Sequence, residues 1–321
     1  MGRYIGRRAI TGAFTVAVVL VLNFFLIHFA PGDPITILAG TDNPSQELID
    51  ITKAKYGLDK PVIVQLWTYI KTLLKGDLGY SIIYGRSVAA LIKERLGNTL
   101  LLTFTSAILA LLIGTSLGLI AARRSGSALD NGISVIAYVL YAMPSFWLGL
   151  MMMLLFATGL GLLPTSGMVD SRASYTGIKY VLDVLKHMAL PVGTLTLVGV
   201  PTYFRITKAS LAQVMKDDYI TLFRATGMDE KRIFQKYSFR NAILPTITTF
   251  GIRLAYVMTG ATTTEIVFAW PGMGRLVMSA INTRDYPVLM GTYLIMSISV
   301  AVCMILVDVL YAVADPRIRY D

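Results

Sequence analysis

The sequence is poor in charged residues, cysteine and histidine. Charged residues make up 15% of the 321 positions, whereas a soluble globular domain has about 25%. With one cysteine, Cys303, the chain cannot form an internal disulfide. The histidines, His28 and His187, are far apart in sequence and neither has another good ligand beside it, so we expect no metal site.

A phosphate-binding loop of the form G-x-x-x-x-G-K-[ST] is also missing from the sequence. In ATPases the backbone of this loop holds the phosphates of the nucleotide, and its lysine neutralises their charge. We therefore expect that the chain does not hydrolyse ATP itself.

Long apolar runs are abundant, since 55% of the residues are hydrophobic and the mean hydropathy is +0.63. A transmembrane helix needs about 20 mostly apolar residues to cross roughly 30 Å of hydrocarbon. The sequence predicts an all-α polytopic membrane protein with six transmembrane helices, and Pro144 is expected to kink the third. The six segments are 10–30, 98–122, 132–160, 188–204, 246–264 and 288–314.

The formal net charge of +10 is a matter of orientation rather than of nucleic-acid binding. Four segments between or outside the predicted spans hold 15 of the 29 basic residues but only seven of the 19 acidic ones. Basic residues concentrate in cytoplasmic loops, so both termini are expected in the cytoplasm. These inner segments are 1–10, 122–132, 205–245 and 312–321.

The segment 31–97 is too long for a simple loop. It contains three short amphipathic stretches, which begin near Asn43, Ile63 and Val88. They are expected either to lie on the lipid surface or to form a platform for an extracytoplasmic partner. The sequence thus divides into a first span (1–30), this outer insertion and a five-helix core (98–321) that contains the inner loop 205–245.

Within the inner loop, the pattern predicts two helices joined by a glycine corner. Residues 210–226 form the first expected helix, and Gly227 is expected in the left-handed conformation that ends many helices. Asp229 is the expected N-cap of the second helix, 230–242. Exposed apolar side chains at such a corner favour contact with a partner protein, although an ordinary basic inner loop explains the same pattern.

This inner segment resembles the EAA loop of binding-protein-dependent ABC importer permeases. Thr221-Leu222-Phe223 stands at the E-A-A positions and Gly227 at the glycine, but the glutamate and both alanines of the consensus are absent. Further matches to the dipeptide, oligopeptide and nickel branch follow in order along nearly the whole chain. They are PGDP (31–34), YGLDKP (56–61), GDLG (76–79), MPSFW (143–147), RNAILP (240–245), EIVFAWPGMG (265–274), RDYP (284–287) and DPR (315–317).

The resemblance implies a type I ABC importer permease in a bacterial or archaeal plasma membrane. It implies a second, homologous permease subunit, two ATPase subunits and an extracytoplasmic solute-binding protein as partners. It also implies that the chain is a transport subunit and not an enzyme, that it binds no cofactor itself, and that the ATPase subunits bind ATP and Mg²⁺. Dipeptides or oligopeptides are the expected substrates, with nickel chelates, glutathione or oligosaccharides as alternatives. A secondary transporter is the rival from another class, but the inverted repeat typical of that class is not visible in the sequence.

The expected functional residues form three groups. The residues expected to meet an ATPase are Thr221, Leu222, Phe223, Arg224, Ala225, Gly227 and Asp229. Arg253 and Asp308 lie about 12 and 10 Å from the inner ends of consecutive antiparallel spans, so they are expected to form an intramembrane ion pair. The alternative is that each side chain snorkels toward the membrane surface or faces the pore alone. Candidates for the outer face or the translocation path are Asp33, Glu265, Trp270 and Asp285, with a loop hydrogen bond as the alternative for Glu265.

Overall fold

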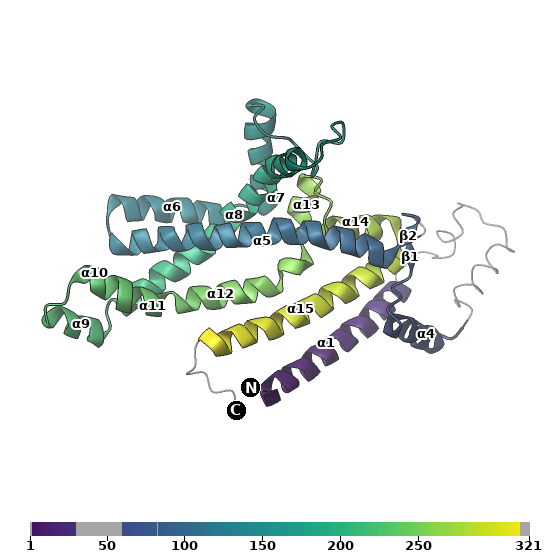
Figure 1. Cartoon of the computed structure of the whole chain (residues 1–321), viewed down its shortest axis with the longest axis horizontal. Helices are drawn as coiled ribbons and strands as arrows, with labels where there is room; N and C mark the ends of the chain where they lie inside the picture. Colours follow the sequence, from purple (N-terminus) through teal and green to yellow (C-terminus); the bar gives the residue numbers. More distant parts are fainter. Residues whose placement is uncertain (1, 30–59, 82, 315–321) are drawn as a thin grey trace.

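The computed structural model describes residues 2–29, 60–81 and 83–314. These residues are mostly helical. They contain one short hairpin, in which β1 (Tyr80–Ser81) pairs antiparallel with β2 (Arg86–Ser87). Asp33 and the motifs at 31–34 and 315–317 lie outside the described residues. In Figure 1, α4 (Val62–Leu74) and the hairpin lie at one end of the view, and α9 (Asp218–Ala225) and α10 (Glu230–Arg232) lie at the other.

Four described helices are long and apolar enough to cross a membrane. They are α1 (Gly2–His28), α5 (Val88–Arg123), α8 (Ile178–Val214) and α15 (Tyr286–Ala314). Two of them, α5 and α8, begin ten residues before the predicted spans. The third amphipathic stretch of the outer insertion forms the first turns of α5, so the expected boundary at residue 98 falls inside a helix. α8 passes through Pro191 and Pro201 without a break.

The third predicted span is a broken one. α6 (Ala128–Ala142) and α7 (Ser145–Met152), which continues into η1 (Met153–Gly159), are bent by 107°. The break lies at Met143 and Pro144, as expected, because proline lacks the N–H that a helix interior requires. Counted as one span, this bent pair brings the described spans to five.

The prediction of one continuous helix over 246–264 is wrong. α12 (Leu244–Ala255) ends early, a single turn η3 (Val257–Thr259) follows, and the chain breaks before α13 (Thr262–Val267). Gly260 has φ = +84° and ψ = 166°, a conformation that glycine adopts far more readily than other residues and that turns the chain out of the helix. The twelve residues of α12 cover about 18 Å, which is less than the thickness of the hydrocarbon core.

The centre of the fold is the crossing of α5 and α8, which small residues make possible. Ala110, Gly114 and Gly118 recur every four residues along one face of α5. A Cβ atom at Gly114 would stand 2.6 Å from the carbonyl oxygen of Val200, so the two backbones approach too closely for a larger residue. Small residues at this spacing are typical of helix packing inside membranes.

Other helices pack around α5 and along α15. α14 (Met273–Thr283) packs against α5 and α15, in a core that contains Val88, Leu276 and Val288. α1 runs along α15 (Figure 1) and is otherwise exposed along most of its length. α4 packs on α1 through stacking of Tyr69 on Phe24 and exposes large apolar side chains, so both expected uses of the outer insertion stay open.

Candidate functional site

The inner loop is built around a well-formed glycine corner. Gly227 has φ = +75°, its N–H donates to the carbonyl of Arg224, and the N–H of Met228 donates to the carbonyl of Phe223, both at 3.0 Å. This pair of hydrogen bonds is the Schellman ending of a helix. The Asp229 carboxylate then accepts from the N–H of Arg232 at 3.1 Å and caps the next helix. The predicted conformations of both residues are confirmed.

The prediction of a single helix over 210–226 is wrong. α8 ends at Val214, and α9 begins only at Asp218 after a turn. The backbone of Asp217 is extended, and its carbonyl accepts from the N–H groups of Ile220 and Thr221. Asp217 thus stands at the N-cap of a separate helix without a capping side-chain hydrogen bond, and Asp218 places a negative charge in the first turn, where the helix dipole favours it.

α9 is seated on the helix that follows the corner. Ile220 of α9 and Ile233 of η2 (Ile233–Ser238) are fully buried. The ring of Phe223 lies 4.4 Å from that of Tyr237, measured between ring centroids. The side chain of Asn241, in α11 (Phe239–Ala242), donates to the Tyr219 hydroxyl at 3.1 Å. The two helices therefore form one packed unit.

Leu222 and Phe223, which the sequence places together at the corner, have different surroundings. Leu222 is 60% exposed, whereas Phe223 is half-buried against aromatic rings of the loop itself. Leu222 is therefore the apolar side chain available to a partner. Thr221, Arg224 and Ala225 are exposed around it.

One ion pair spans the corner. Arg224 Nε donates to Glu230 Oε1 at 2.6 Å, and both side chains are exposed. The hydrogen bond from Arg224 to Glu230 raises the pKa of Arg224 above its ordinary value. Exposed ion pairs contribute little to stability. The pair therefore orients α9 relative to α10 but adds little to holding them together.

Side-chain contacts lie where the inner loop meets the spans. The Arg123 guanidinium, at the end of α5, lies 3.6 Å from the ring centre of Phe234 and joins η2 to α5. Two other contacts join spans to one another. The hydroxyls of Thr207 and Thr246, 2.9 Å apart, connect α8 to α12, and Lys208 of α8 forms an ion pair with the buried carboxylate of Asp130 in α6.

The expected outer-face residue Glu265 lies inside the protein. Its side chain is fully buried and accepts from the Thr99 hydroxyl at 2.8 Å and from the N–H of Arg275 at 3.0 Å. The Thr99 hydroxyl oxygen accepts in turn from the N–H of Met273 at 2.7 Å. Of the two alternatives for Glu265, the structure shows structural hydrogen bonds, but their donors lie in α5 and α14 rather than in a loop.

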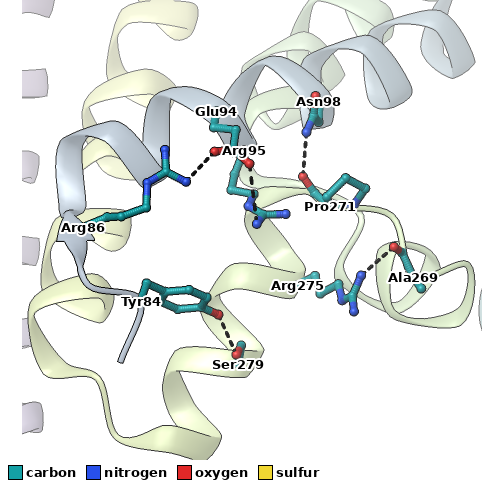
Figure 2. Close-up of polar contacts among 9 residues, drawn as sticks. All are labelled: Tyr84, Arg86, Glu94, Arg95, Asn98, Ala269, Pro271, Arg275 and Ser279. Carbon is teal, nitrogen blue, oxygen red and sulfur yellow. Dashed lines mark hydrogen bonds and ion pairs between the residues drawn. The ribbon is translucent and has the colours of Figure 1, made fainter. Parts of the chain in front are cut away.

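Hydrogen bonds also hold residues 268–272, which connect α13 to α14. Trp270 is fully buried, and its Nε1 donates to the carbonyl of Asn98 at 3.0 Å. Figure 2 shows the return bond from Asn98 Nδ2 to the carbonyl of Pro271, at 2.9 Å. Figure 2 also shows Arg275 donating to the carbonyl of Ala269 at 2.6 Å. These contacts hold the loop on the outer part of α5.

Asp285 likewise has structural contacts. It is buried, accepts from the Ser81 hydroxyl and from the N–H of Val288 at 3.4 Å, and so links the hairpin to the start of α15. Figure 2 shows a second link on this side, between the hydroxyls of Tyr84 and Ser279 at 2.8 Å.

The predicted Arg253–Asp308 pair stays a prediction, because the side chain of Asp308 lies outside the described residues. Arg253 Nη2 donates to Thr202 Oγ1 at 3.0 Å. In the part of the chain that the structure describes, no group of three or more His, Cys, Asp or Glu side chains forms a metal-binding arrangement.

Comparison with known families agrees with this architecture. The family described as "Binding-protein-dependent transport system inner membrane component" matches residues 114–320, and the family of its N-terminal part matches residues 1–103. The chain belongs to this permease family. The permease is therefore a multi-pass inner-membrane transport component, and the alternative of a secondary transporter is excluded.

Two relatives match the permease over its full length. It is 35% identical over 321 residues to the oligopeptide transport system permease protein AppB of Bacillus subtilis (strain 168). It is 35% identical over 320 residues to the glutathione transport system permease protein GsiC of Escherichia coli O6:H1. Both alignments cover 100% of the permease and 100% of the relative.

A chain of the MetNI methionine ABC transporter, solved in inward-facing conformations, has a similar fold. The TM-score is 0.54 at 17% sequence identity, and the likeness covers 71% of the permease and 97% of that chain. The permease therefore has the fold of a type I ABC importer permease.

Asp130 and Lys208 are residues of the permease that the sequence reasoning missed. Asp130 is the only acidic residue in the short inner segment 122–132, and this feature of the sequence could have identified it as a candidate. An acidic residue among basic ones next to a span favours an ion pair with a basic residue of a neighbouring helix. Nothing in the sequence indicates that this residue is Lys208, 78 positions away.

Proposed function

We propose that the permease is one of two different membrane subunits of an ATP-driven importer for dipeptides or oligopeptides. The observation that carries this proposal is the end-to-end match to an oligopeptide permease, which includes the long segment between the first two spans. In this proposal, a solute-binding protein delivers the substrate to the outer face, and a homologous second permease completes the pathway.

The corner from Thr221 to Asp229 is proposed to dock on one of two partner ATPase subunits. Those subunits bind ATP and Mg²⁺, and the permease itself is proposed to have no catalytic role. The packing of α9 on η2 supports a docking unit that moves as a body. Closure of the ATPases would then be passed to the spans as a rigid-body rotation.

Glutathione is a second candidate substrate, because an equally similar relative is a glutathione permease.

One experiment decides between the candidates. The permease is purified with the subunits encoded beside it and reconstituted in liposomes with ATP inside. Uptake of a labelled tripeptide and of labelled glutathione is then compared, with and without the binding protein. We expect uptake of the peptide that requires ATP and the binding protein. Uptake of glutathione alone would overturn the peptide assignment.

A further inference from the structure

Arg253 places a cation on an exposed face of α12, in the segment 246–264 that the sequence predicts as the fifth span. It lies eight residues after Pro245, about 12 Å along the helix, and its side chain is exposed. Arginine is strongly disfavoured against lipid hydrocarbon, and charged residues inside membrane proteins usually face a bundle interior or a water-filled cavity. The exposed face around Arg253 is therefore unsuited to contact lipid.

Neighbouring polar groups hold the guanidinium in place. Thr202 of α8 accepts one of its five N–H groups at 3.0 Å, and the guanidinium carbon lies 5.8 Å from the ring centre of Tyr203. The Tyr203 hydroxyl is buried without a hydrogen-bond partner among the described residues. Contacts with α8 thus orient the Arg253 side chain, and Thr202 accepts only one of its five N–H groups.

Two further polar side chains lie close to Arg253 along the chain. Thr249 lies four residues before Arg253 on the same side of α12, and its hydroxyl donates to the carbonyl of Pro245 at 2.9 Å. Tyr256 follows the last residue of α12. Tyr256 is 55% exposed. An exposed guanidinium with hydroxyl groups close to it suits a path for a polar solute better than contact with lipid.

We infer that Arg253 binds the terminal carboxylate of the substrate on the translocation path. This inference rests on the proposed function, since peptides and glutathione both carry a free carboxylate. A guanidinium presents two parallel N–H groups that match the two oxygens of a carboxylate. With Thr202 fixing its orientation, Arg253 would select solutes with a carboxylate over otherwise identical amides.

The first experiment needs no substrate. In the assembled complex, Cys303→Ala removes the native thiol, and Thr249→Cys places a new thiol one turn from Arg253. The cysteine is reacted with an anionic sulfonate methanethiosulfonate and with its cationic trimethylammonium counterpart. We expect both to react, and we expect Arg253→Gln to slow the anionic reagent about tenfold while leaving the cationic one unchanged or faster. Arg86→Gln, a cation lost at the outer face, should change neither rate.

Two outcomes of this experiment would overturn the inference. A cysteine that reacts with neither reagent, or a rate ratio that Arg253→Gln leaves unchanged, would remove Arg253 from a water-filled path. A severalfold rise of the anionic rate on Asp308→Asn would mean that Asp308 already neutralises Arg253. Because labelling needs no transported substrate, these results stand even if the peptide assignment fails.

The second experiment tests selectivity. Uptake of one peptide as the free acid and as the carboxamide is measured in liposomes at saturating binding protein, and the acid-to-amide ratio of each variant is divided by that of the wild type. This division removes the preference of the binding protein. We expect Arg253→Gln to lower the ratio about tenfold, the value of a 1.4 kcal/mol difference, and Arg253→Lys to lower it less. An equal loss for both peptides would assign Arg253 a structural role and overturn the inference.

Discussion

At the scale of single residues, buried polar groups decide how the outer loops are held. Glu265 and Asp285 are both acidic residues that a sequence reader would place near substrate, yet each accepts hydrogen bonds from neighbouring segments. Buried carboxylates of this kind are costly unless they are satisfied. Glu265 therefore connects α13 to α5 and α14, and Asp285 connects the start of α15 to the hairpin.

Glu265→Gln is expected to destabilise the permease by about 1–3 kcal/mol. The two carboxylate oxygens accept from the Thr99 hydroxyl and the Arg275 N–H, so an amide must turn its own NH₂ toward one of these donors. The Thr99 hydroxyl already accepts from Met273, which leaves it little freedom to reverse. Thermal unfolding of the purified complex measures the effect.

The matched control for this substitution is Glu94→Gln. Glu94 forms an exposed ion pair with Arg86 at 2.9 Å, shown in Figure 2, so the same chemical change should alter stability by less than about 0.5 kcal/mol. Equal shifts of the unfolding temperature for both variants would contradict the structural role of Glu265.

At the scale of helices, close backbone contact fixes how α5 crosses α8. Gly114→Ala is expected to destabilise the fold by about 1–3 kcal/mol, because the added Cβ would lie 2.6 Å from the Val200 carbonyl oxygen and 2.8 Å from Tyr203 Cβ. Gly97→Ala in the same helix has nothing within 4 Å and should be neutral or slightly stabilising. Unfolding temperatures of the two variants test this, and a neutral Gly114→Ala would show that the helices are farther apart.

The inner loop gives a second prediction at this scale. Phe223→Asp is expected to loosen α9, because it places a charge against Tyr237 and Tyr219 inside the loop. Leu222→Asp changes an exposed position and should leave the loop folded. Hydrogen exchange of residues 218–232 should therefore become faster in the first variant only. Faster exchange in both variants would contradict the assignment of Leu222 as the free surface residue.

Local features of these elements could be predicted from sequence, and non-local ones could not. The left-handed Gly227 and the capping Asp229 follow from residue type and spacing alone. The break at Gly260 was missed because hydropathy averages over a window and glycine does not interrupt an apolar run. The partner of Glu265 was beyond prediction because Thr99 lies 166 positions away.

At the scale of the whole molecule, the outer and inner loops of the permease are held differently. The outer loops are fastened to α5 by buried hydrogen bonds, whereas the inner loop packs on itself and contacts α5 through Phe234 and Arg123. Such an arrangement suits transmission of motion from the cytoplasmic face. The central claim is that an ATPase acts on this permease through the exposed surface of α9.

The most direct test is to measure ATP hydrolysis and peptide uptake together in the reconstituted importer, with wild-type permease and with Leu222→Asp. A charge at this position should disrupt an apolar contact without unfolding the loop. The account predicts that uptake falls at least about tenfold and that hydrolysis no longer responds to the loaded binding protein, while Glu94→Gln behaves as wild type. Normal coupled uptake by Leu222→Asp would contradict it.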